Sequence, residues 1–265
     1  MTKTLRVLVV DDDRGMSITL TAILTIKGYQ AENASSGLDA LQRVLESRYD
    51  CVFSDIRMPD INGVSLCRAI KMKHPDLPVV LMTAYSADAM IDEGMREGAV
   101  AVLTKPLDID RILGFLSLAR RQPEAVIVDD DRDFCETLSR LLDSQGFEVT
   151  EVTNPDELTD ALGPNGKVLL LDMKLAGTDG AEVLRRVQRP YPRLPVILVT
   201  GYRDEMAPAI RVALEIGARR CLYKPFRPEE LLKALRQIRH EEFAEALEGD
   251  LTVLRHALFT HRDRR

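Results

Sequence analysis

The chain carries one seven-residue pattern twice, and this internal repeat constrains its fold more than any other feature. Residues 8–14 read LVVDDDR and residues 126–132 read VIVDDDR, so Asp130 stands 118 positions after Asp12. Three more pairs of landmarks follow in the same order in both halves: Phe53-Ser54-Asp55 and Leu170-Leu171-Asp172, Met82-Thr83 and Val199-Thr200, and Thr104-Lys105-Pro106 and Tyr223-Lys224-Pro225. An ordered repeat of this length predicts two copies of one domain, and 265 residues are enough to bury two cores.

Within each copy, short runs rich in β-branched residues alternate with amphipathic stretches of helical length. This alternation predicts an α/β fold in which helices cover a parallel sheet. In the first copy we expect strands near residues 6–10, 29–34, 51–54, 79–82 and 101–103. Gly28 and Gly146 are expected to close the first helix of each copy, and Asn154, followed by Pro155 and Glu157, to begin the second helix of the second copy.

The repeat divides the chain into a first domain over residues 1–121 and a second over residues 125–240. The linker between them, residues 122–124, reads QPE, and three extended residues span only about 10 Å. Because a proline stiffens this short linker, we expect the two domains to restrict one another, so that a change in one biases the other. Residues 241–265 are too few for a further domain and are expected to form a helical extension or tail.

This C-terminal extension carries an apolar stripe, interrupted by Gly249-Asp250. Its members stand at spacings of four, four, three and four residues: Phe243, Leu247, Leu251, Leu254 and Leu258. Such spacing predicts an amphipathic helix. Two interpretations stay open, namely that the helix folds back onto the second domain, or that it binds a partner or a second copy of the chain.

The repeated polar residues are expected at the carboxyl ends of the strands, where open parallel sheets bind ligands. They are Asp11, Asp12, Asp55, Thr83 and Lys105 in the first copy, and Asp129, Asp130, Asp172, Thr200 and Lys224 in the second. Carboxylates are the hard oxygen ligands that Mg²⁺ prefers, and Asp12 and Asp55 can supply two of them. An aspartate can also attack phosphorus to give an acyl phosphate, while ammonium and hydroxyl groups neutralise the transferring oxygens. Lys105 and Thr83 suit that second role.

The motifs around these residues resemble the receiver domains of two-component response regulators, from Leu5 to about Gln237. The first copy reads VVDDD, SDIRMPDING, LMTA and LTKPL, and the second reads IVDDD, LDMKLAGTDG, LVTG and YKPF. Gly63 and Gly180 each stand eight residues after the aspartate of the second motif. The resemblance implies two flavodoxin-like (βα)5 domains, each with a parallel five-stranded sheet of order 2-1-3-4-5, followed by the helical extension.

The resemblance also implies the acceptors of the phosphoryl group and the ligands of Mg²⁺. The acceptors would be Asp55 and Asp172. The direct ligands of the cation would be these acceptors together with Asp12 and Asp130, and the backbone carbonyls of Arg57 and Lys174. Asp11 and Asp129 would act mainly by supporting these ligands. The phosphoryl oxygens would be held by Thr83 with Lys105 and by Thr200 with Lys224, beside the small Ala84 and Gly201. The pocket entrances would be bordered by Tyr85, Tyr202 and the basic side chains of Arg57 and Lys174, which are expected to tune the lifetime of the acyl phosphate.

Both copies depart from the family pattern at positions that, in many receivers, couple phosphorylation of the pocket to a change at the protein surface. Many receivers place Tyr or Phe three residues before the lysine, whereas Val102 and Cys221 stand there in this chain. The second copy also has Ala176 where the first has Pro59, and Pro208 falls in the first turn expected for its fourth helix. We therefore expect the phosphorylation chemistry without the usual aromatic switch.

Other interpretations of these residues are weaker. The D-x-D pattern of a haloacid-dehalogenase-like phosphatase requires Thr or Val two places after its second aspartate, where Gly15 and Asp133 stand. His240-Glu241 resembles the phosphorylated pair of a histidine kinase, but no nucleotide-binding glycine motif accompanies it, so a solvated helix histidine is expected. The four cysteines lack histidines at zinc-ligand spacing and are expected to be reduced thiols: Cys51, Cys67, Cys135 and Cys221.

The charge balance argues against nucleic acid and anionic membranes as partners. Lys and Arg number 36 against 42 Asp and Glu, which gives a formal net charge of −6. No apolar run approaches the roughly 20 residues that span a bilayer, and the N-terminus has no signal-type apolar core. A cytoplasmic protein is expected.

Together these features predict a non-enzymatic tandem response regulator that is phosphorylated by a histidine kinase or a histidine phosphotransfer protein. It would act through contacts with a downstream protein target, and a homodimer is a further candidate. Two alternatives stay open. One is a phosphorelay intermediate or phosphate sink, and the other is the sensory part of a longer output enzyme.

Overall fold

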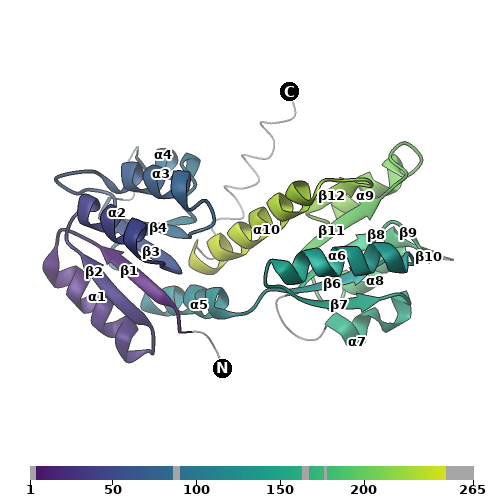
Figure 1. Cartoon of the computed structure of the whole chain (residues 1–265), viewed down its shortest axis with the longest axis horizontal. Coiled ribbons are helices and arrows are strands. Elements are labelled where there is room, and N and C mark those ends of the chain that lie inside the picture. Colours follow the sequence, from purple (N-terminus) through teal and green to yellow (C-terminus); the bar gives the residue numbers. More distant parts are fainter. Residues whose placement is uncertain (1–3, 86–89, 163–166, 176–177, 249–265) are drawn as a thin grey trace. The chain divides into compact units, whose positions relative to one another are not determined.

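The computed structural model describes residues 4–85, 90–162, 167–175 and 178–248 (Figure 1). Contacts between residues divide the chain into two compact units. The first unit contains Met1–Arg121 together with Arg239–Arg265, and the second contains Gln122–Ile238. None of the helices in the described part of the chain is long and apolar enough to cross a membrane.

The first unit alternates strands and helices throughout. In chain order these are β1 (Arg6–Val10), α1 (Arg14–Ile26), β2 (Gln30–Ala34), α2 (Gly37–Glu46), β3 (Cys51–Asp55), α3 (Gly63–Lys73), β4 (Val79–Thr83), α4 (Met90–Arg96), β5 (Ala101–Thr104) and α5 (Ile109–Arg120). The strands pair in parallel in the order β2-β1-β3-β4-β5. The predicted α/β fold and strand order are therefore confirmed for this unit.

The central strands β1, β3 and β4 are largely apolar on both faces because helices cover both faces of the sheet. Every residue of β3 and β4 is buried. Successive residues of β1 enter opposite cores: Val7 and Val9 pack with α1 and α5, whereas Leu8 packs with α2 and α3. Continuous β-branched runs of this kind are typical of central parallel strands.

The second unit repeats this architecture. Its elements are β6 (Glu124–Val128), α6 (Arg132–Ser144), β7 (Glu148–Val152), the 3-10 helix η1 (Pro155–Glu157), α7 (Leu158–Leu162), β8 (Lys167–Asp172), β9 (Lys174–Leu175), β10 (Thr178–Asp179), α8 (Gly180–Gln188), β11 (Val196–Thr200), α9 (Ala207–Ile216), β12 (Arg220–Tyr223) and α10 (Pro228–Glu248). The main sheet is parallel with the order β7-β6-β8-β11-β12, equivalent to that of the first unit. The short antiparallel pair β9-β10 was not predicted.

Gly28 and Gly146 end the first helix of each copy as expected, and Asn154 caps the 3-10 turn η1 that precedes α7. Two aspartate caps were not predicted. Asp13 caps α1 by accepting hydrogen bonds from the backbone N–H groups of Gly15 and Met16, and Asp131 caps α6 by accepting one from Phe134. Gly28 and Gly146 follow these helices with φ of +87° and +84°, a conformation that side chains with a Cβ rarely adopt. The third aspartate of each DDD motif thus acts as a helix cap, whereas the first two aspartates are available to the pocket.

Helix α10 contributes to both units, and this differs from both interpretations of the C-terminal stripe. Its first turns supply Leu231, Ala234, Leu235 and Ile238 to a core cluster of the second unit. From Arg239 onward it belongs to the first unit, where Phe243, Ala244 and Leu247 join a core cluster. The expected boundary after residue 240 falls inside this continuous helix. Leu251, Leu254 and Leu258 lie outside the described residues.

His240 is not the solvated helix histidine that was expected. It is partly buried, and burial lowers its pKa below 6.5, with the nearby Lys71 acting in the same direction. Hydrogen bonding with the backbone of Gly98 and Ala99 opposes this shift in pKa. The prediction failed because the groups that face His240, on Lys71, Gly98 and Ala99, come from a distant part of the chain.

Candidate functional site

In the first unit the repeated polar residues converge at the carboxyl edge of the sheet. Asp11 follows β1, Asp55 and Thr83 end β3 and β4, and Lys105 follows β5. Asp11, Asp55 and Thr83 are buried, with 1%, 7% and 1% of their surface exposed. The Nζ of Lys105 donates to Asp11 Oδ2 at 2.7 Å and to Asp55 Oδ1 at 2.5 Å. One ammonium group therefore bridges two buried carboxylates.

Backbone groups hold these side chains in place. The N–H of Asp13 donates to Asp11 Oδ1 at 2.9 Å, and the N–H of Arg57 donates to Asp55 Oδ2 at 2.7 Å. Gly63 allows the loop after Asp55 to pass close to β3, because a Cβ there would lie 2.2 Å from the carbonyl oxygen of Asp55. A steric constraint thus explains why glycine stands eight residues after the aspartate.

The second unit places the matching residues at the same edge. Lys224 Nζ donates to Asp129 Oδ2 at 2.6 Å and lies 3.5 Å from Asp172 Oδ1. The N–H of Lys174 donates to Asp172 Oδ2 at 3.1 Å. Gly180 allows the loop after Asp172 to pass equally close to β8, because a Cβ at this position would lie 2.6 Å from the carbonyl oxygen of Asp172.

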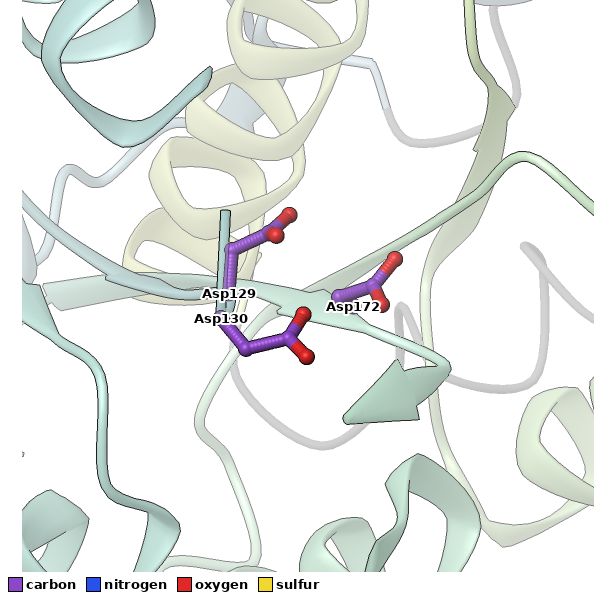
Figure 2. A group of neighbouring side chains, drawn as sticks. All are labelled: Asp129, Asp130 and Asp172. Carbon is purple, nitrogen blue, oxygen red and sulfur yellow. The ribbon is translucent and has the colours of Figure 1, made fainter. Parts of the chain in front are cut away.

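Three carboxylates of the second unit form a group that can hold a metal ion. Asp129, Asp130 and Asp172 each offer an oxygen, and these oxygens lie within 4.8 Å of one another. Figure 2 shows the three side chains side by side at the ends of β6 and β8. Oxygen-only donors of this kind suit a hard cation such as Mg²⁺.

The electrostatics of both pockets reflect charges placed in a largely buried site. Burial raises the pKa of Asp11 and of Asp172, although Lys105 and Lys224 respectively pull these values down. Burial by itself would lower the pKa of each lysine, but hydrogen bonds to the aspartates outweigh it, and the pKa of both lysines is raised. Asp11 and Asp172 therefore lack full compensation for their lost hydration, which a bound cation would supply.

Comparison with known proteins fits this geometry. Residues 7–117 and residues 125–236 each match the response regulator receiver domain. The chain belongs to the response regulator receiver family. Its two units are receiver domains in tandem, of the kind found in two-component systems.

The chain is similar to several individual proteins. A response regulator receiver protein of Anaeromyxobacter sp. strain Fw109-5 is 33% identical over 237 residues, which cover 89% of this chain and 96% of that protein. The transcriptional regulatory protein ZraR of Klebsiella oxytoca is 42% identical over 113 residues, which cover 43% of this chain and 26% of ZraR. The high-resolution structure of the chemotaxis response regulator CheY4 of Vibrio cholerae is 28% identical with a TM-score of 0.41, covering 44% of this chain and 99% of that one.

Each receiver carries a cation–ring pair that sequence reasoning did not foresee. The guanidinium of Arg57 lies 4.7 Å from the ring centroid of Tyr85, and Lys174 Nζ lies 3.8 Å from that of Tyr202. Both tyrosine rings are largely exposed. These residues were expected to border the pocket entrances, but the sequence did not indicate that each cation would lie over the neighbouring ring.

The positions that depart from the receiver pattern are only partly described. Val102 lies in β5 and Cys221 in β12, both partly buried. Pro208 is in the first turn of α9, as expected. Ala176 lies outside the described residues. The aromatic Phe134 and Phe226 beside Lys224 were missed because each resembles an ordinary core residue in the sequence.

Proposed function

We propose that this tandem receiver protein accepts phosphoryl groups on Asp55 and Asp172 and signals through protein contacts. The observation that carries the proposal is the duplicated convergence of buried carboxylates, a threonine and a lysine at the carboxyl edge of each sheet. Two pockets with the same residues in the same places fit one chemistry better than chance polar strand ends.

In the proposed reaction an oxygen of Asp55 or Asp172 forms a bond to phosphorus. The bond from phosphorus to the nitrogen or oxygen of the donor breaks, and the donor leaves with the electron pair and takes up a proton. Thr83 with Lys105, and Thr200 with Lys224, would hold the oxygens of the transferring group. The lysines are already within reach of the acceptor carboxylates, 2.5 Å away in the first pocket and 3.5 Å in the second.

Mg²⁺ would be held at each acceptor by a neighbouring carboxylate and a backbone carbonyl. These groups are Asp12 and Arg57 beside Asp55, and Asp130 and Lys174 beside Asp172, with Asp11 and Asp129 behind them. When bound, the cation neutralises charge on the transferring oxygens. The donor chemistry fits, because the second pocket brings three carboxylate oxygens within 4.8 Å of one another.

The phosphoryl donor would be a histidine kinase or a histidine phosphotransfer protein, as for other receivers. The output would be contact with a downstream protein target, or between two copies of the chain. Nucleic acid is the less suitable partner, because the formal net charge is −6.

The test is labelling with acetyl phosphate and Mg²⁺, followed by intact mass measurement. Two phosphoryl additions are expected on the wild-type chain, one on Asp55→Ala or Asp172→Ala, and none on the double variant. Asp143→Ala, at an exposed position of α6, is the matched control and should accept two. Undiminished labelling of the double variant contradicts the proposal.

A further inference from the structure

The lysines of the two pockets lie differently against their acceptor aspartates. Lys105 Nζ is 2.5 Å from Asp55 Oδ1, whereas Lys224 Nζ is 3.5 Å from Asp172 Oδ1. Burial does not explain the difference, because the two lysine side chains are 21% and 23% exposed. Both lysines also keep their contact with the other buried aspartate, at 2.7 Å and 2.6 Å.

An aromatic ring lies beside the ammonium group of Lys224. Its Nζ lies 4.0 Å from the ring centroid of Phe134, a distance at which the negative face of the ring attracts an ammonium group. Phe134 in turn meets Phe226 edge to face, with centroids 6.0 Å apart and planes at 89°. The matching positions of the first receiver hold Met16 and Leu107, which offer no ring.

The two acceptor carboxylates differ in their hydrogen bonds and in their neighbouring carboxylates. In the first receiver both oxygens of Asp55 accept close hydrogen bonds, from Lys105 at 2.5 Å and from the N–H of Arg57 at 2.7 Å. In the second, Asp172 joins a group of three carboxylates suited to a metal ion. Over the described residues, the carboxylates of the first pocket form no such group.

The residues proposed to line the two pockets carry the same formal charge. Each pocket contains three aspartates, one lysine in the pocket and one basic residue at the entrance, Arg57 or Lys174. A difference in cation binding between the pockets would then follow from where these charges are placed. The aromatic pair beside Lys224 has no aromatic counterpart at the matching positions of the first receiver.

We propose that Phe134 is a positioning residue, which draws Lys224 away from Asp172 so that the second receiver binds Mg²⁺ more tightly than the first. This inference rests on the proposed function, since it concerns the same cation at the same acceptors. It adds an order to the two pockets: as free Mg²⁺ rises, the second becomes occupied first and is the first to be ready for phosphoryl transfer.

The test is a Mg²⁺ titration of the ¹⁵N-labelled full chain, followed by the backbone amide signals of Arg57 and Lys174. These two N–H groups donate to Asp55 and Asp172, so each reports on its own pocket. We expect a Kd for Mg²⁺ at the second pocket that is roughly threefold to tenfold lower than at the first, the range expected for one cation–ring contact.

Substitutions exchanged between the two receivers provide matched variants. Phe134→Met should raise the Kd of the second pocket for Mg²⁺ towards that of the first. Phe134→Tyr keeps a ring and should leave this Kd at the wild-type value. Met16→Phe should lower the Kd of the first pocket. Thermal unfolding of each variant tells a change in binding from a loss of fold. The Met16→Phe variant keeps the inference testable if Phe134→Met does not fold.

The outcomes separate the inference from the proposed function. Equal Kd values in the wild type, or a ratio unchanged by both Phe134→Met and Met16→Phe, overturn the role of Phe134 and leave the phosphorylation chemistry intact. If neither amide responds to Mg²⁺, the metal dependence of the proposed function fails as well, and the inference fails with it.

Discussion

Phe243 packs edge to face against Phe115, with ring centroids 5.1 Å apart and ring planes at 84°. The two residues come from α10 and α5, more than a hundred positions apart in the sequence. Phe243 is 5% exposed, and Leu247, one turn further along α10, is fully buried. The end of α10 is therefore part of the core of the first receiver and not an appendage to it.

Phe243→Ala should destabilise the first receiver by about 3 kcal/mol, the usual cost of emptying a buried aromatic site. Hydrogen exchange of the β1 and β3 amides in the full chain measures this, because the slowest amides report on global unfolding of their domain. Met72→Ala is the control, since Met72 is 79% exposed and its loss should change the free energy of unfolding by less than about 0.5 kcal/mol. A loss below about 1 kcal/mol for Phe243→Ala would show that the contact contributes little.

The stability of the first receiver should also fall as the pH drops through 6.5. Burial lowers the pKa of His240 in the folded protein below that value, so the unfolded chain takes up the proton first. Stability from the neutral imidazole is thus present above the unfolded pKa of 6.5 and lost below it. Lys71 disfavours the imidazolium, whereas Glu241 favours it.

The measurement is the free energy of urea unfolding between about pH 7.5 and pH 5.5, the range around an ordinary histidine pKa. His240→Gln should flatten the pH dependence, whereas His74→Gln, at an exposed position of the same receiver, should retain it. The same slope in both variants would assign the effect to other groups.

Gly63→Ala should destabilise the first receiver by about 2 kcal/mol, because the added methyl group would meet the carbonyl oxygen of Asp55 at 2.2 Å. Gly114→Ala in α5 is the opposite control: its Cβ would meet no atom within 4 Å, and removing a helical glycine should stabilise by up to about 1 kcal/mol. Thermal unfolding measures both. A Gly63→Ala variant as stable as the wild type would mean that the loop shifts without strain.

Lys105→Ala should slow phosphoryl transfer to Asp55 by about a hundredfold, a typical effect of losing one group that stabilises transition-state charge. The rate is read as mass gain from acetyl phosphate in an Asp172→Ala background, so that only the first receiver is labelled. Lys73→Ala is the matched control, since Lys73 is exposed at the end of α3. A Lys105→Ala rate within about threefold of the parent would remove Lys105 from the proposed chemistry.

The sequence by itself determined the duplicated α/β fold, the strand order implied by the motifs, and the residues at the carboxyl edge of each sheet. These features were accessible because they are local. Buried parallel strands have apolar runs in the sequence, the glycines at φ of +87° and +84° and the cap at Asn154 obey short-range rules, and each landmark occurs twice.

Only the tertiary structure decided what the apolar side chains pack against. Periodicity placed Phe243 on an apolar stripe, but it did not indicate that Phe115 covers this residue, because that contact depends on the path of the whole chain. In the same way, sequence motifs placed Lys224 in its pocket, but whether its ammonium favours Asp172 or the ring of Phe134 is a balance of short-range forces that depends on the folded geometry.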